Sequence, residues 1–177
     1  MTCIVGLEAE GKVFIGGDSA AARGWDIFPT RLRKVFKREK FLIGYTTSFR
    51  MGQLLQCKLT VREREEDEDD LNYLVVGFVE AVRDCLKTGG FTKVKDEKEE
   101  GGEFLVGYDG RLYRIESDFQ VNSSRNGLMA AGSGEAYALG NLLATGHLAP
   151  RKRIVAALRA AARFSNGVCP PFYVEVL

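Results

Sequence analysis

The order of its β-rich and helical segments is the feature of this sequence that most restricts its fold. Alternating or continuous apolar runs predict strands, whereas apolar residues three or four apart predict helices. The predicted order is strands, two helices, strands, two helices and a last strand, without an internal repeat or a linker. Segregation of this kind is typical of α+β proteins, in which antiparallel sheets pack together and helices cover their outer faces. We expect one domain over residues 1–177, a length that buries a core without disulfides or metals.

Four strands are predicted within the first 45 residues. Gly11 can adopt a positive φ and predicts a tight turn between the first two strands. Small residues from 19 to 24 predict a loop, after which residues 38–40 predict a second hairpin turn. The predicted strands are residues 3–8, 12–17, 33–37 and 41–45.

The middle of the chain is predicted to be helical. One amphipathic helix covers residues 51–59, and a second apolar stripe covers residues 71–86 and ends at the glycines 89–90, as a helix C-terminus does. The charged run over residues 62–70 predicts a solvated helix end or loop rather than an acidic docking surface. Residues 93–102 are charged and poor in apolar side chains, which predicts a mobile surface loop.

The second half of the chain is again predicted to form strands followed by helices, with one further strand at the end. Asp109-Gly110 is the strongest short hairpin signal in the sequence. Pro150 predicts the first turn of the last helix. Strands are predicted at residues 104–108, 111–115, 119–121, 128–131 and 172–177, and helices at 135–144 and from 150 onward.

Composition and charge argue against several classes of function. A net charge of +1 gives no general attraction to nucleic acid or to an anionic membrane. No apolar run approaches the length of about 20 residues that spans a bilayer, and the start resembles neither a signal nor a transit peptide. We therefore expect a cytoplasmic protein with no membrane and no nucleic-acid partner. The basic clusters at residues 31–40 and 151–153 keep a nucleic-acid-binding module as a competing hypothesis.

Metal and disulfide sites are not predicted, and no organic cofactor is expected. The cysteines are scattered and lack C-x-x-C spacing, which indicates buried reduced thiols. The single histidine, His147, leaves too few ligands or bases for a zinc site or a Ser-His-Asp triad. The four cysteines are Cys3, Cys57, Cys85 and Cys169.

Thr2, Asp18 and Lys34 form the candidate site, because they follow one another at intervals of 16 residues and lie on or beside predicted strands. A threonine hydroxyl needs an adjacent base, and a free α-amine on the same residue, with a pKa of about 7.7 to 8.0, supplies one. The charge of Lys34 would lower the pKa values of the hydroxyl and the amine, and Asp18 would hold Lys34 in place. The amine becomes free only when Met1 is removed.

Each of these residues also has an ordinary interpretation. Asp18 could cap a turn and Lys34 could be a solvated strand residue, but their joint spacing favours a site. Cys3 is a rival nucleophile if Met1 and Thr2 are both removed. The shift of one residue would turn its side chain to the other face of the strand, which argues against it.

The motifs around the candidate site resemble those of the proteasome β-subunits and of the protease subunit of the HslUV (ClpQY) complex. Four motifs occur in the family's order and spacing along nearly the whole chain. They are Met1-Thr2-Cys3-Ile4-Val5, Gly16-Gly17-Asp18, Leu32-Arg33-Lys34-Val35 and Gly132-Ser133-Gly134. The resemblance implies a four-layer αββα sandwich of the N-terminal-nucleophile (Ntn) hydrolase class. It also implies a threonine-type endopeptidase of the proteasome/HslV kind.

The resemblance implies roles for further residues. Ser133 and Ser165 would contact the Thr2 amine and help to move its proton. The backbone N–H of Ser48 stands where the family uses a glycine N–H in its oxyanion hole, and any residue except proline retains this donor. The Ser48 side chain would narrow the substrate cleft. The remaining substrate-binding positions are matched by Thr46, Thr47 and Arg50.

The resemblance implies an assembly as well. Subunits of the family form homo-oligomeric rings that stack with their active sites inside, and a separate ATPase unfoldase feeds them protein or peptide substrates. The charged segments at residues 62–70 and 93–102 are longer than their HslUV counterparts, a departure that argues against carrying over the ring contacts and the ATPase partner of HslUV unchanged. The alternative is a catalytically inactive, structural ring protein of the same fold that retains Met1.

Overall fold

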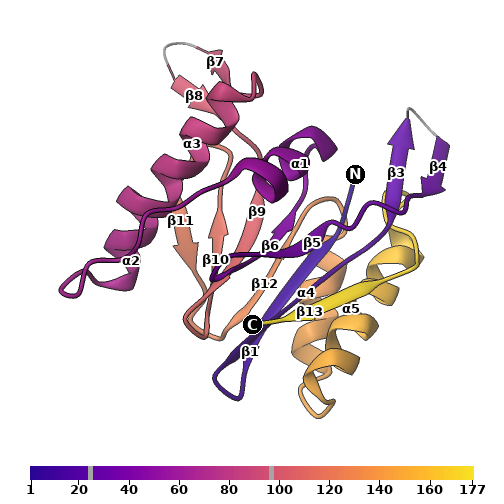
Figure 1. Cartoon of the computed structure of the whole chain (residues 1–177). Coiled ribbons are helices and arrows are strands. Elements are labelled where there is room, and N and C mark those ends of the chain that lie inside the picture. Colours follow the sequence, from indigo (N-terminus) through magenta and orange to yellow (C-terminus); the bar gives the residue numbers. More distant parts are fainter. Residues whose placement is uncertain (24–25, 96–97) are drawn as a thin grey trace.

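Two antiparallel sheets form the centre of the molecule (Figure 1). The computed structural model describes residues 1–23, 26–95 and 98–177. The four-stranded sheet has the order β12 (Leu128–Ala131), β1 (Ile4–Ala9), β2 (Lys12–Gly17) and β13 (Tyr173–Val176). The five-stranded sheet has the order β11 (Val121–Ser123), β10 (Arg111–Ile115), β9 (Phe104–Tyr108), β6 (Phe41–Tyr45) and β5 (Val35–Arg38).

An apolar layer joins the two sheets face to face. Successive side chains of a strand point to opposite faces, so Ile4 and Ile15 of one sheet meet Leu42 and Leu105 of the other. Gly44 lies at a close approach of the two sheets, because a Cβ at this position would be only 2.6 Å from Ile4 Cγ2. The missing side chain therefore lets β6 approach β1.

Helices cover the outer faces of both sheets. The five-stranded sheet carries α1 (Phe49–Lys58), α2 (Asp70–Asn72), η1 (Tyr73–Phe78) and α3 (Val79–Thr88). The four-stranded sheet carries α4 (Glu135–Ala144) and α5 (Pro150–Phe164). The layers are therefore helix, sheet, sheet and helix, which confirms the predicted α+β sandwich (Figure 1). None of the helices in the described part of the chain is long and apolar enough to cross a membrane.

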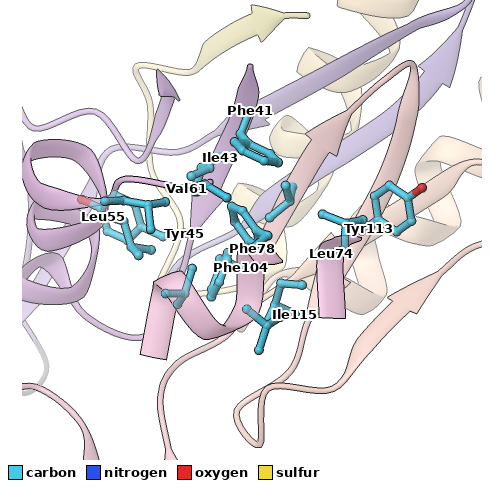
Figure 2. Close-up of a cluster of buried hydrophobic side chains, with 14 of the residues drawn as sticks. Phe41, Ile43, Tyr45, Leu55, Val61, Leu74, Phe78, Phe104, Tyr113 and Ile115 are labelled. Atoms are coloured by element: carbon cyan, nitrogen blue, oxygen red, sulfur yellow. The ribbon is translucent and has the colours of Figure 1, made fainter. Parts of the chain in front are cut away.

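The cluster between the five-stranded sheet and its helices is rich in aromatic rings (Figure 2). The ring centroid of Phe41 lies 4.6 Å from that of Phe78 and 5.0 Å from that of Tyr108. Tyr73 is buried beside them, and its hydroxyl donates to the Arg62 carbonyl at 2.7 Å. The π-helical turn of η1, which the sequence analysis did not predict, carries both Tyr73 and Phe78 into this cluster.

Two short hairpins include segments that are predicted as loops. β3 (Ala20–Arg23) pairs with β4 (Asp26–Pro29), and β7 (Lys93–Lys95) pairs with β8 (Lys98–Glu100). Each of these strands has only three or four residues, so no sustained apolar alternation marks them in the sequence. Residue 24 of the first predicted loop and residues 96–97 of the second lie outside the described residues.

The strand predicted at residues 119–121 is displaced to β11. Phe119 has a φ of 68°, and its N–H donates to the Glu116 carbonyl at 3.0 Å. A bulky residue with a positive φ belongs to a turn rather than to a strand. The ladder with β10 therefore begins only at Val121.

Candidate active site

Thr2 lies two residues before the start of β1, on the side that points into the space between the sheets. Ile4 packs between the sheets, whereas Cys3 and Val5 pack against α4 and α5. The alternation of a strand places Thr2 on the same face as Ile4. Thr2 is buried, and its hydroxyl points toward the residues that the sequence spacing singles out.

Lys34 connects Thr2 to Asp18. Its ammonium group lies 2.9 Å from Thr2 Oγ1 and 2.9 Å from Asp18 Oδ1. The side chains of Lys34 and Asp18 are 1% and 0% exposed, so the ion pair is shielded from water. Asp18 directly follows β2 and Lys34 directly precedes β5, which explains how strands of different sheets bring them together.

Backbone amides hold the Asp18 carboxylate from two sides. Its Oδ1 accepts from the N–H of Cys3 at 3.0 Å. Its Oδ2 accepts from the N–H of Ala20 at 2.7 Å and from that of Cys169 at 3.4 Å. These donors fix the orientation of the carboxylate. Asp18 can therefore act as a rigid counter-ion for Lys34.

Burial lowers the pKa of Lys34 below its ordinary value of 10.5, and the charge of Asp18 opposes this effect only in part. The ammonium group also lies 5.6 Å from the centre of the Phe49 ring, which offers it a cation–π contact. A cation shielded from water beside a hydroxyl favours loss of the hydroxyl proton. The geometry therefore suits a nucleophilic Thr2 oxygen.

The segment Gly132–Gly134 brings Ser133 to Thr2. Gly132 has a φ of 94°, and a Cβ there would be 2.4 Å from the Thr2 carbonyl oxygen, so only glycine allows this approach. The Thr2 N–H donates to Ser133 Oγ at 3.3 Å. Ser165 Oγ donates to Ser133 Oγ at 3.2 Å. The structure thus links both predicted serines to the Thr2 nitrogen through two successive hydrogen bonds.

Met1 lies against the same group of residues. The Thr2 hydroxyl donates to the Met1 carbonyl at 2.5 Å. A Cβ at Gly167 would lie 2.2 Å from the Met1 Cβ, so the glycine leaves room for this residue. While Met1 is attached, the Thr2 nitrogen is a peptide amide and cannot take up a proton as an amine does.

A cavity of about 90 Å³ opens beside Thr2 and Lys34. Thr46, Thr47 and Ser48 line one side of it. The further lining residues are Met1, Ala22, Tyr45 and Phe49, which the sequence analysis did not select. Tyr45 and Phe49 flank the predicted segment, so sequence proximity could have indicated them, whereas Ala22 gives no such signal.

The Ser48 amide does not point freely into this cavity. Its N–H donates to the Thr46 carbonyl at 2.6 Å across Thr47, which has a φ of 59°. Such a tight turn is strained for a β-branched residue. Arg50 is not among the residues that line the cavity, and its guanidinium donates to the Gly89 carbonyl at 3.2 Å.

Cys3 is poorly placed to compete as a nucleophile. Its side chain is 0% exposed and belongs to the core beneath α4 and α5. Burial, with the nearby charge of Asp18, raises the pKa of its thiol to about 12. The prediction of a buried thiol is confirmed for Cys3 but is wrong for Cys57, which is exposed on α1. In the described part of the chain, no group of three His, Cys, Asp or Glu residues is placed to hold a metal ion.

The layers define a class of fold. Two packed antiparallel sheets between helical layers match the fold of the HslV- and proteasome-like Ntn hydrolases. The predicted resemblance and fold class are confirmed at this level.

Solved structures share this fold. BPH of Thiobacillus denitrificans superposes with a TM-score of 0.84 at 17% sequence identity, covering 99% of this chain and 97% of that one. The same protein in complex with epoxomicin gives 0.82 at 17% identity, covering 99% and 98%. Eukaryotic HslV from Trypanosoma brucei gives 0.71 at 18% identity, covering 99% of each chain. Neither a protein-family model nor a curated protein sequence matches the chain.

Proposed function

We propose that this chain is a threonine-type endopeptidase of the proteasome/HslV kind, with Thr2 as the nucleophile after removal of Met1 and of anything that precedes it. One observation carries the proposal: the buried Lys34 ammonium lies within 2.9 Å of both the Thr2 hydroxyl and the Asp18 carboxylate. Burial of a lysine charge is unfavourable unless the charge is paired or serves a functional site. The buried position of Lys34 therefore argues against an ordinary solvated surface lysine.

The reaction uses the groups already described. The free Thr2 amine accepts the hydroxyl proton while Oγ1 attacks the carbonyl carbon of a peptide bond, and the charge of Lys34 stabilises the developing alkoxide. The protonated amine then gives its proton to the leaving nitrogen, so the first product is an amine and the second an ester on Thr2. Water attacks the ester with the same amine as base and regenerates the hydroxyl. Ser133 and Ser165 assist these proton transfers.

Substrate binding involves the segment Thr46–Ser48. The oxyanion of the tetrahedral intermediate requires a donor close to the reacting carbon. Ser48 N–H is our candidate, and it must exchange its bond to the Thr46 carbonyl for one to the substrate oxygen. Arg50 would act at the rim, because its guanidinium must leave the Gly89 carbonyl to reach a substrate.

The assembly that we propose is a homo-oligomeric ring, stacked as a double ring and located in the cytoplasm, that degrades proteins or peptides supplied by an ATPase unfoldase. The fold that the chain shares with HslV from Trypanosoma brucei supports it. Exposed apolar side chains on the outer helices also favour contact with other subunits, since such groups often mark interaction surfaces. Leu143 of α4 and Phe164 of α5 are 71% and 68% exposed.

The intact mass of the purified protein tests the proposal directly. We expect a mass lower by one methionine residue than the sequence predicts, because aminopeptidases remove Met before a small residue such as Thr2. The same sample should hydrolyse fluorogenic peptides, and epoxomicin should inhibit it. A protein that lacks Met1, is folded and still fails to cleave a broad peptide library would contradict the proposal.

The second candidate is an inactive, structural ring protein that keeps Met1. The hydrogen bond from the Thr2 hydroxyl to the Met1 carbonyl favours it, because it shows that the site accommodates the uncleaved residue. The same mass measurement separates the candidates. A retained Met1 together with an absence of peptide cleavage would establish the structural role.

The lowered pKa of Lys34 predicts a particular alkaline limit of activity. Activity needs the charged ammonium, so kcat/KM should fall as pH rises through the lowered pKa, at a pH below 10.5. The contribution of Lys34 to the free energy of unfolding should change with pH in the opposite direction. Between the folded and unfolded pKa values the unfolded chain binds more protons, so the contribution of Lys34 to the free energy of unfolding rises with pH.

Two measurements check this prediction. The pH dependence of kcat/KM gives the alkaline limit, and denaturant unfolding of the wild type and of Lys34→Met over the same pH range gives the stability term by difference. Activity that persists undiminished above pH 10.5, with the protein still folded, would show that a charged Lys34 is not required.

A further inference from the structure

Arg114 stands at the edge of the space between the two sheets and is surrounded by carboxylates. It lies two residues beyond Leu112, which packs between the sheets, so both point to the inner face of β10. Its side chain is only 19% exposed. Ion pairs join Nη2 to Glu103 at 3.3 Å, Nη1 to Glu135 at 2.7 Å and Nε to Glu116 at 3.1 Å.

Glu103 connects Arg114 to the wall of the cavity beside Thr2. The Glu103 carbonyl accepts from Thr46 twice, from its N–H at 3.0 Å and from its hydroxyl at 2.9 Å. The Glu103 N–H donates to Thr47 Oγ1 at 3.2 Å. Glu103 therefore holds both threonines that precede the Ser48 amide, and Arg114 fixes the side chain of Glu103.

Glu135 connects Arg114 to the segment that contacts Thr2. Glu135 is the first residue of α4 and directly follows the segment Gly132–Gly134, and its N–H donates to the Gly132 carbonyl at 3.1 Å. Ser133, the middle residue of that segment, contacts the Thr2 nitrogen. Arg114 also donates to the Ala130 carbonyl of β12 at 3.2 Å. The guanidinium thus fixes the start of α4 relative to β12.

We propose that Arg114 is a positioning residue, which holds the Ser133 segment and the Thr46–Thr47 wall at a fixed separation on the two sides of Thr2. This inference rests on the proposed peptidase function. A guanidinium suits the task because its planar fork bonds several carboxylates at once, whereas a lysine ammonium is a single point. No local sequence pattern links Arg114 to Glu103, Ala130 and Glu135, since these partners lie before β9, on β12 and on α4.

Glu116 provides a matched control within the same cluster. It pairs with the same guanidinium, but its Oε1 also accepts from Asn122 Nδ2 at 3.2 Å, on β11 and away from Thr2. Loss of its charge removes one ion pair from Arg114 without releasing a segment of the site. Glu116→Gln should therefore leave kcat and KM within about twofold of the wild type, as expected for a partly exposed pair.

The test compares kcat and KM for peptide hydrolysis by the wild type, Arg114→Gln, Arg114→Lys, Glu135→Gln, Glu103→Gln and Glu116→Gln, with thermal unfolding of each protein. Misplacement of catalytic groups by about 1 Å can cost up to about 100-fold, so we expect both Arg114 variants to lose at least about tenfold in kcat/KM. Glu135→Gln keeps its backbone bond to Gly132 but loses the ion pair to Arg114, so it should lower mainly kcat by loosening the Ser133 segment. Glu103→Gln keeps its backbone bonds to Thr46 and Thr47 but loses the ion pair to Arg114, so it should raise mainly KM by loosening the cavity wall.

The outcomes separate the inference from the function on which it rests. If the folded Arg114→Lys and Glu135→Gln variants match Glu116→Gln in kcat and KM, the positioning role is wrong although the peptidase stands. Arg114→Gln leaves three carboxylates facing one another, so if it does not fold, Arg114→Lys and Glu135→Gln decide the question. An inactive wild type would overturn the proposed function, and this inference with it.

Discussion

Replacing Thr2 with alanine should abolish peptide cleavage and leave the fold and the assembly intact. The hydroxyl is the group that Lys34 contacts, and alanine provides no oxygen to form the ester, so we expect a loss of at least about a thousandfold, as for other nucleophile replacements. The side chain is small and lies just before β1, so its loss removes little apolar contact. Fluorogenic peptide hydrolysis, circular dichroism and sedimentation measure activity, fold and assembly on one sample.

Two control variants sharpen this result. Thr2→Ser retains the hydroxyl and should retain measurable cleavage, whereas Cys3→Ala should retain activity because the Cys3 thiol is buried on the other face of β1. Full activity of Thr2→Ala would refute the assigned nucleophile. Loss of activity in Cys3→Ala alone, with the fold intact, would transfer the role to Cys3.

Lys34→Ala should also abolish cleavage, and unlike Thr2→Ala it should destabilise the protein. The variant removes the cation beside the Thr2 hydroxyl and leaves the buried Asp18 carboxylate without its counter-ion. Breaking a buried ion pair from one side costs about 3 to 5 kcal/mol. The amides that donate to Asp18 compensate part of its charge, so we expect the lower end of that range. Peptide hydrolysis and denaturant unfolding measure the two effects.

The design of this experiment must separate lost chemistry from lost folding. Lys34→Met keeps an apolar stem of similar length and should be inactive with less disturbance of packing. Lys37→Ala serves as the matched control, because Lys37 is an exposed lysine of the neighbouring strand β5. Cleavage by folded Lys34→Met at a rate near that of the wild type would exclude Lys34 from the mechanism.

Those parts of the fold that depend on local patterns could be predicted from the sequence. Asp109 and Gly110 adopt φ values of 45° and 74°, as a tight hairpin requires, and β9 and β10 have the predicted bounds. The hairpins of β3 with β4 and of β7 with β8 could not be predicted. Each of these strands has only three or four residues, which is too short for a clear apolar pattern.

The candidate site could also be predicted only in part. Thr2, Asp18 and Lys34 could be selected because strand alternation and spacing fix which face each side chain occupies. The contacts of Glu103 and Arg114 could not, since each joins residues that are distant in the sequence and share no motif. The direction of the Ser48 N–H could not be predicted either, because it depends on the positive φ of Thr47.

The three amides that surround Asp18 have a consequence for when this site can come into existence. They belong to Cys3 near one end of the chain, to Ala20 of β3 and to Cys169 near the other end. The Cys169 amide is 151 positions away from Asp18 in the sequence, so it can reach the carboxylate only after the segments between them have folded. The complete set of donors around Asp18, which also fixes the counter-ion of Lys34, is therefore a late product of folding that no single hairpin or helix can form on its own.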